Sequence, residues 1–335
     1  MTNIRDIADH AGVSIATVSR ALSKPEVVRP ETLEKIKLAI AELDYQPNML
    51  AAGLRRQRSG NIIVAVPSIL NPFTAAFVQG IENIAREAGY RVLLGITDSD
   101  QTLLDTYVNM IAGKQADGLI LLDVILPTIV TQADNGVKRP PIVAACEYPP
   151  GLNIPRVRQD NVEAAAVVVA HLARLGHSQI AMISGPEQQQ MARDRSAGVR
   201  LGLRRAGLAC EEALTAEGNF TLESGYRAMQ ALIAGARPFT AVCCANDEMA
   251  LGALAALREA GIDVPGQVSV AGFDDLRFAA YSSPPLTTVE VPTVETGERA
   301  MQLMLDQLRD PDDAPREIVL PHRLIVRQST GPAPA

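Results

Sequence analysis

The distribution of hydrophobic and polar residues changes at about residue 61 of the chain. Residues 1–45 carry apolar side chains at helical spacing and contain no run typical of a strand, which predicts short helices. From residue 61 onward, short apolar runs alternate with stretches of helical periodicity. A connector lies between the two regions at 46–60, with Pro47 and a basic cluster at 55–58. The pattern therefore predicts a small helical unit followed by a larger α/β unit.

The apolar runs of the larger unit are its predicted strands, and they are apolar throughout rather than alternating. Such runs are typical of parallel strands that helices cover on both faces. They occupy 61–68, 90–99, 117–123, 140–148, 179–186, 240–247 and 268–275, with two further strands expected within 316–330. The strand–helix scheme begins again at residue 179, so we expect two doubly wound lobes. Ligands of such sheets bind at the carboxyl ends of strands, which places 68–74, Asp98, Asp160, 246–247 and 274–275 at or near a cleft between the lobes.

The helical unit begins with a predicted helix that has one apolar face and Asn3 as its N-cap. Gly12 favours a tight turn, Ser14 can cap a second helix, and we expect that helix to bury Val18 and Leu22. The first helix is expected to bury Ile4, Ile7, Ala8 and Ala11, and a third helix with Pro30 in its first turn is expected to bury Leu33, Ile36, Ile40 and Leu43.

A helix, a glycine-containing turn and a second helix form the helix-turn-helix layout, whose second helix enters the major groove of DNA. Arg20 can make two hydrogen bonds to guanine, and the methyl groups of Ile15 and Ala16 can meet thymine methyls. Thr17 and Ser19 also face outward and can reach phosphates and bases. From the spacing alone, an ordinary small helical bundle with a polar face stays open as the alternative.

Composition narrows the class of protein. The 335 residues exceed one ordinary core, no apolar run reaches the ~18 residues of a membrane span, and residues 1–14 lack the apolar stretch of a signal peptide. We therefore expect a cytoplasmic protein. Residues 1–60 contain 9 Lys and Arg against 7 Asp and Glu, so this part is basic by +2, whereas the total of −7 leaves −9 for the remainder. This asymmetry suits a protein that touches DNA through one end only.

The cysteines show no spacing typical of a zinc site, and no metal or cofactor is expected. We expect Cys146, Cys210, Cys243 and Cys244 to be reduced and mostly structural. Cys243 and Cys244 are adjacent in a predicted strand, so their side chains should point to opposite faces.

Residues 4–22, IRDIADHAGVSIATVSRAL, together with 31–48 and 48–56, resemble the head, its exit and the hinge helix of the lactose-repressor (LacI/GalR) family. The resemblance implies that two hinge helices pair over the minor groove and that Leu54 inserts at the central base step, which would kink the DNA. A packed or linker role is the alternative for Leu54. Two departures from the family are Arg29, where a capping serine is common, and Val27, where polar residues can reach phosphate. The residues assigned to DNA are Ser14, Ile15, Ala16, Thr17, Ser19, Arg20, Asn48, Ala51, Leu54 and Arg55.

The resemblance continues over about residues 60–330, in the motifs NPF (71–73), RSAGV (195–199), GNFTLESG (218–225), CANDEMALGA (244–253), GFDD (272–275) and PPLTTV (284–289). It implies an all-α helix-turn-helix head plus an α/β core, in which two doubly wound parallel-sheet lobes resemble a type I periplasmic binding protein and are joined by three crossovers. The implied boundaries are 1–45 for the head, 46–60 for the hinge helix and linker, 61–160 with 291–322 for the N-terminal lobe, and 161–290 with 323–335 for the C-terminal lobe.

The family resemblance also implies an effector site between the lobes. Its residues would be Phe73, Thr74, Asp160, Arg195, Phe220, Asn246 and Asp274. Aromatic rings there offer apolar surfaces for a ligand ring, and the polar groups offer donors and acceptors to a hydroxylated ligand. Each of these residues has an alternative role. The four polar residues at 246–247 and 274–275 can each cap a helix or turn, and capping is favoured for Asp247. Arg195 can be a solvated charge, and Phe220 can belong to the core.

The stretches 145–155, 184–188 and 218–229 resemble the cytidine-responsive repressors of the family, which implies a nucleoside effector, while a sugar stays open. The leading hypothesis is a ligand-responsive repressor that binds double-stranded operator DNA as a homodimer, because one head covers only a half-site. We see no leucine-heptad extension for a tetramer and expect no membrane association. The alternatives are a nutrient-uptake-type solute-binding protein, disfavoured by the head, and an enzyme using the carboxylates at 274–275, for which no base, nucleophile or metal partner stands at a convincing spacing.

Overall fold

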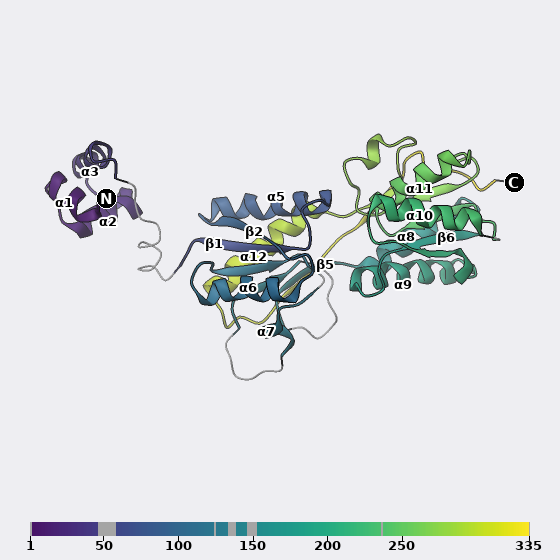
Figure 1. The fold of residues 1–335 in the computed structure, drawn as a ribbon, viewed down its shortest axis with the longest axis horizontal. Helices are drawn as coiled ribbons and strands as arrows, with labels where there is room; N and C mark the ends of the chain where they lie inside the picture. Colours follow the sequence, from purple (N-terminus) through teal and green to yellow (C-terminus); the bar gives the residue numbers. More distant parts are fainter. Residues whose placement is uncertain are drawn as a thin grey trace. The chain divides into compact units, whose positions relative to one another are not determined.

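The computed structural model describes residues 2–45, 58–123, 125–132, 139–145, 153–235 and 237–334, and the chain separates into two compact units, Met1–Ser59 and Gly60–Ala335. The first unit is helical and the second is α/β, as the hydropathy pattern predicts (Figure 1). No helix in the described ranges has both the length and the hydropathy needed to cross a membrane.

The first unit, the head, consists of α1 (Ile4–Ala11), α2 (Ile15–Ser23), the 3₁₀ turn η1 (Pro25–Val27) and α3 (Pro30–Glu42). Asn3 caps α1 in a capping box, because its side chain accepts from the Asp6 N–H while Asp6 accepts from the Asn3 N–H. Gly12 ends α1 at φ +65°, a conformation that glycine adopts without steric cost, and the Ser14 side chain caps α2. The predicted helix-turn-helix layout is confirmed.

The core of the head contains Ile7, Ala8, Val18, Ala21, Ile36 and Ala39, with Ile4, Ala11, Leu33, Ile40 and Leu43 packed around them. The prediction that Leu22 faces inward is wrong. Leu22 is 39% exposed, and the smaller Ala21 contacts the other helices in its place. Ala21 leaves room for α2 to approach its neighbours closely.

The larger unit contains a six-stranded sheet in the order β11-β5-β4-β3-β1-β2, in which every neighbouring pair is parallel. Its strands are β1 (Asn61–Val66), β2 (Arg91–Ile96), β3 (Gly118–Leu121), β4 (Ile142–Ala144), β5 (Arg156–Gln159) and β11 (Glu317–Leu320). Its helices are α5 (Pro72–Glu87), α6 (Gln101–Ala112), α7 (Thr128–Thr131) and α12 (Thr293–Arg309).

Strand β1 shows how this sheet, the first lobe, is covered on both faces. Ile62, Val64 and Val66 pack with α5 and α12, whereas Ile63 and Ala65 pack with α6. All five side chains are buried, which explains why the run is apolar throughout.

The second lobe is a parallel four-stranded sheet in the order β7-β6-β8-β9, with α10 and α11 on one face and α8 and α9 on the other. Its strands are β6 (Ile180–Ser184), β7 (Thr215–Glu217), β8 (Ala241–Cys244) and β9 (Ser269–Ala271). Its helices are α8 (Asn161–Arg174), α9 (Gln190–Arg205), α10 (Leu222–Ala234) and α11 (Asp247–Glu259), with 3₁₀ turns η2 (Glu212–Leu214) and η3 (Ala279–Tyr281). The prediction of two doubly wound lobes is confirmed (Figure 1).

Cys243 and Cys244 lie on β8 and face opposite helical layers, as predicted. Both are buried free thiols, whereas Cys210 is exposed, so its expected structural role is not what the structure shows. Cys146 lies outside the described residues.

In the described residues the chain passes between the two sheets at 159–161, 290–293 and 320–323. Two of these passages flank a small antiparallel pair, β10 (Thr288–Glu290) with β12 (Arg323–Ile325). Strands β5, β7 and β10 are absent from the predicted set, because they are three or four residues long and include charged side chains. The carboxyl ends of β1 and β5 and the N-termini of α10 and α11 surround one cavity, which is the candidate site.

Candidate functional site

A cavity of about 480 Å³ is lined by residues of both lobes. The first-lobe residues are Pro67, Ser68, Leu70, Asn71, Phe73, Thr74, Ser99, Leu122, Ala145, Val157, Arg158, Gln159 and Thr296. The second-lobe residues are Gln189, Met191, Asn219, Phe220, Thr221, Glu223, Asn246, Glu248 and Asp274. A small molecule can enter a cavity of this size and meet both apolar and polar groups.

The first-lobe wall is built where β1 ends and α5 begins. Asn71 caps α5 by accepting from the Phe73 N–H at 2.8 Å, and the buried Thr74 donates its hydroxyl to the Ser68 carbonyl at 3.0 Å. These bonds fix the loop that places the Phe73 ring at the cavity. Phe73 and Thr74 therefore lie where the sequence predicts them.

The second-lobe wall depends on Phe220, which has φ +67°. A bulky residue rarely adopts positive φ, so the surrounding structure must hold it there. Asn246 does so, because its Nδ2 donates to the Phe220 carbonyl at 3.0 Å while its Oδ1 caps α11 by accepting from the Met249 N–H at 2.9 Å. The Phe220 ring lies over Gly185, where a Cβ would stand 2.3 Å from the ring. Asn246 thus lines the cavity and also fixes the aromatic wall.

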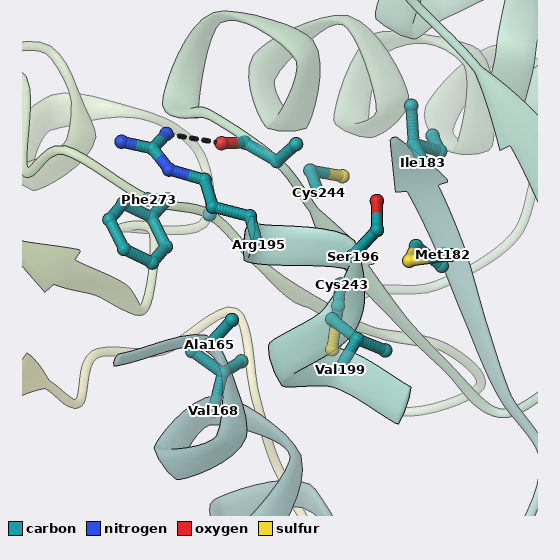
Figure 2. Close-up of a pocket in the computed structure, with 12 residues that line it drawn as sticks. Ala165, Val168, Met182, Ile183, Arg195, Ser196, Val199, Cys243, Cys244 and Phe273 are labelled. Carbon is teal, nitrogen blue, oxygen red and sulfur yellow. Dashed lines mark hydrogen bonds between the residues drawn. The ribbon is translucent and has the colours of Figure 1, made fainter. Parts of the chain in front are cut away.

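Asp274 lines the cavity, and Arg195 holds it from behind in an ion pair of 2.9 Å between Nη2 and Oδ1. Arg195 is 2% exposed; its Nε donates to Asn161 Oδ1 at 2.8 Å and its Nη1 to the Ala245 carbonyl at 2.5 Å. Figure 2 shows the guanidinium beside the Phe273 ring, 3.7 Å from its centroid. Burial raises the pKa of Asp274, and Arg195 opposes that rise. Arg195 is therefore a buried partner of Asp274 rather than a solvated charge, and it lines the small pocket of Figure 2 but not the 480 Å³ cavity.

Asp160 does not contact the cavity in the way that the sequence suggests. Its exposed side chain accepts from the Glu163 N–H at 3.0 Å and caps α8, while the adjacent Gln159 lines the cavity.

Asp247 does not cap α11, the role favoured for it from the sequence, because Asn246 is the N-cap of that helix. Asp247 is fully buried and accepts from the Leu276 N–H at 2.7 Å and the Thr288 hydroxyl at 2.6 Å. Burial raises the pKa of Asp247 well above its usual range.

Two carboxylates in the lining, Glu223 and Glu248, are missing from the predicted site. Each is the second residue of its helix, where acidic side chains are common because they stabilise a helix start, so their type and position do not indicate a ligand. Burial raises the pKa of Glu248, and the negative charges of Asp274 and Glu223 raise it further. Within the described part of the chain, no group of His, Cys, Asp and Glu residues has the arrangement of a metal site.

The second helix of the head presents the surface predicted to read DNA. Ile15, Ala16 and Arg20 are exposed, whereas Thr17 and Ser19 are half-buried. Ser14 is partly committed to the fold, because its hydroxyl accepts from the Thr17 N–H at 3.1 Å. The hinge residues Asn48, Ala51, Leu54 and Arg55 lie outside the described residues.

The head and core match two families of known proteins. Residues 3–48 match the lacI family of bacterial regulatory proteins, and residues 169–330 match the periplasmic binding protein-like domain. The HTH-type transcriptional repressor CytR of Escherichia coli (strain K12) is 38% identical over 331 residues, which cover 99% of this chain and 97% of the relative. The chain belongs to the lacI family. Members of this family are transcriptional regulators rather than enzymes.

Solved structures of two transcriptional regulators are similar to nearly the full length of the chain. The lac repressor dimer bound to operator and the anti-inducer ONPF has a TM-score of 0.88 at 30% identity, and the match covers 98% of this chain and 99% of that one. A complex of the transcriptional regulator CelR with cellobiose has a TM-score of 0.74 at 32% identity, covering 98% of this chain and 100% of that one. The family match thus includes both the helix-turn-helix head and the two-lobed core.

Proposed function

We propose that this lacI-family protein is a ligand-responsive transcriptional repressor, which binds a pseudo-palindromic operator as a homodimer and releases or tightens its hold when a sugar or nucleoside binds between its lobes. The observation that supports this most strongly is the combination, in one chain, of a capped helix-turn-helix head and a cavity with aromatic and polar walls. Solved relatives support both halves, since one is described with operator and another with cellobiose.

The lining suits a ligand with a ring and several hydroxyl groups. Phe73 and Phe220 offer apolar surface to a sugar ring or a base, and the Asp274 carboxylate can accept from hydroxyl donors. Arg158 and Gln159 add donors on the opposite lobe. We propose Phe73, Thr74, Phe220, Asn246 and Asp274 as contact residues, with Arg195 acting through Asp274.

The dimer proposal is supported by exposed apolar side chains on the core. Strand β2 lies at the edge of its sheet, and its Leu93, Leu94 and Ile96 are 37%, 46% and 39% exposed. On the second lobe, Phe278 and Tyr281 are 46% and 88% exposed. Exposed apolar groups on an edge strand are costly in a monomer and typical of a surface that pairs with another chain.

The proposed function predicts that Arg20→Ala weakens operator binding by about tenfold to a hundredfold, because one bidentate contact to guanine is worth roughly 1–3 kcal/mol. An operator is first isolated from random duplexes with the full-length protein, and affinity is then measured by fluorescence anisotropy at several salt concentrations. The matched control is Arg86→Ala, which removes the same charge from an exposed position on α5.

The same operator complex is titrated with cytidine, adenosine, ribose and glucose, and calorimetry measures the binding of each compound to the free protein. We expect one compound to bind and to change operator affinity, in either direction. Failure to select any duplex, or equal loss of affinity in both arginine variants, would contradict the repressor proposal. Binding of a compound with no effect on operator affinity would favour a solute-binding protein.

The bond between Asn246 and Phe220 predicts a specific result for Asn246→Ser. Serine still caps α11, so the free energy of unfolding should change by less than ~0.5 kcal/mol, but the donor to the Phe220 carbonyl is lost. We expect affinity for the bound sugar or nucleoside to fall about fivefold, the value of one hydrogen bond near 1 kcal/mol. Asn246→Asp, which also caps but cannot donate, should show a similar affinity loss; unchanged affinity in both variants would disprove the bracing role.

A further inference from the structure

We propose that the cavity selects an uncharged effector and rejects its phosphate ester, because Glu223 and Glu248 occupy the helix N-termini at which a phosphate group would otherwise bind. The inference rests on the proposed function for the use of this cavity, and it narrows the effector to unphosphorylated sugars or nucleosides. It assigns Glu223 and Glu248 as specificity-determining residues.

Helices α10 and α11 both begin at the cavity. A helix N-terminus carries free N–H groups and a partial positive charge, and it is a ready site for phosphate. Here Thr221 and Asn246 cap the two helices by accepting from the N–H groups of Ser224 and Met249. Glu223 and Glu248 then place a carboxylate in each first turn. The chain thus supplies its own anions at both ends, where an incoming phosphate would meet negative charge.

Three further helices, α5, α9 and α12, also contribute first-turn residues to the lining. Helix α12 contributes Thr296 and carries an acidic residue, Glu295, in its own first turn. Helix α5 is capped by Asn71, and its first residue, Pro72, has no N–H group to donate. Helix α9 has no side-chain cap at Gln189 and no acidic residue in its first turn, so it is the terminus that remains available to an acceptor. A base carbonyl or a hydroxyl oxygen can accept from it without bringing a negative charge into the cavity that Glu223 and Glu248 line.

The two arginines near the cavity are each bound to a carboxylate of the chain itself. Arg158 lines the cavity, but its Nε is bound to Glu317, which also accepts from Arg156 Nη2 at 3.0 Å. Arg195 is bound to Asp274. Glu223, Glu248 and Asp274 are therefore the charges of the second-lobe lining, and Arg158 is the basic residue among the lining residues of the described chain.

The electrostatic effect is large enough to decide specificity. Two unit charges about 6 Å apart, in surroundings with an effective dielectric constant near 20, repel strongly enough to change an equilibrium constant roughly a hundredfold. A phosphate ester carries up to two negative charges near neutral pH, so even one nearby carboxylate disfavours it against the parent alcohol.

The test compares cytidine with cytidine 5′-monophosphate, and ribose with ribose 5-phosphate, by calorimetry on the full-length protein. For the compound pair that binds, we expect wild type to prefer the unphosphorylated member at least about a hundredfold. Glu223→Gln and Glu248→Gln together should reduce that preference about tenfold or more. The matched control, Glu295→Gln, removes a carboxylate from the first turn of α12, where it is paired with Arg299 outside the cavity, and should leave the preference unchanged.

Two results would overturn the inference: tighter binding of a phosphorylated compound by wild type, or an unchanged preference in the double variant. Titration with inorganic phosphate, followed by ³¹P NMR, separates this inference from the proposed function, because it needs no effector. The double variant should bind phosphate more tightly than wild type and than Glu295→Gln. If no sugar or nucleoside binds, the proposed function fails while the phosphate titration still decides the inference, since equal phosphate affinity in all three proteins contradicts it.

Discussion

Replacement of Arg195 by methionine is expected to lower the free energy of unfolding by about 3–5 kcal/mol, the usual cost of removing one partner of a buried ion pair. Methionine fills much of the same space, so the loss comes from the groups left behind. Asp274 stays buried without its cation, and the Asn161 Oδ1 and Ala245 carbonyl lose their donor. The variant should also lose effector binding, because Arg195 fixes the position of Asp274.

Urea unfolding followed by circular dichroism measures the stability, with Arg205→Met as the matched control. Arg205 lies on the same helix, but its ion pair with Glu163 is exposed, so that variant should lose much less stability than Arg195→Met. The difference between wild type and Arg195→Met should narrow as the pH falls, because a protonated Asp274 no longer needs a cation. A pH-independent difference, or equal losses in the two variants, would show that the pair is not the source of the stability.

Gly252→Ala is expected to destabilise the second lobe by about 3 kcal/mol or more, although alanine in a helix interior normally stabilises by about 1 kcal/mol over glycine. The reason is the close approach of α10 and α11. A Cβ on Gly252 would lie 2.1 Å from the Leu222 carbonyl oxygen and 2.6 Å from the Tyr226 nitrogen, both backbone atoms. Separating the helices also moves Phe220 away from Asn246, so effector affinity should fall with stability.

Thermal unfolding and calorimetry test this prediction, with Gly113→Ala as the control. Gly113 follows α6. A Cβ added at Gly113 would lie 3.5 Å from its nearest atom, the Asn109 carbonyl oxygen, which is an ordinary contact distance. That variant should keep wild-type stability within ~0.5 kcal/mol. A Gly252→Ala protein as stable as wild type would mean that the two helices can separate without cost.

Local signals made the head predictable. Asn3, Gly12 and Ser14 each act within four residues of their own position, so spacing alone assigns the caps and the turn correctly. The error at Leu22 has a different origin. Whether Leu22 or Ala21 faces inward depends on how closely α2 approaches the other helices, and this distance is set by tertiary packing.

The strands also divide into those that local sequence identifies and those that depend on distant contacts. Long apolar runs such as 61–66 are buried on both faces, and their hydropathy alone identifies them as strands. Strand β5 instead alternates half-buried arginines with buried residues. Arg156 and Arg158 are tolerated there because both bind Glu317 on β11, more than 150 residues later. No local pattern contains that partner.

The candidate site was predictable where chemistry and the strand ends coincide, as at Phe73 and Asp274. It was not predictable where one residue serves another. Arg195 binds Asp274, and Asn246 donates to the Phe220 carbonyl. Both contacts join separate elements of the fold, so a local sequence pattern does not contain them. Glu223 and Glu248 could not be predicted from the sequence, because acidic residues are common in the first turn of a helix. Only the folded structure shows that both side chains line the cavity.

The back-to-back cysteines of β8 have a practical consequence for measuring motion in this protein. Burial raises the pKa of Cys243 to about 12 and raises that of Cys244 as well, so neither thiol forms an appreciable thiolate while the lobe is folded. Because the two side chains enter opposite helical layers, alkylation of each reports the opening of a different layer. Exposed Cys210 serves as the internal reference for reagent reactivity. Fragmentation of the alkylated peptide that holds both cysteines identifies which one has reacted. This distinguishes the detachment of one layer from cooperative unfolding of the whole lobe, without any introduced probe.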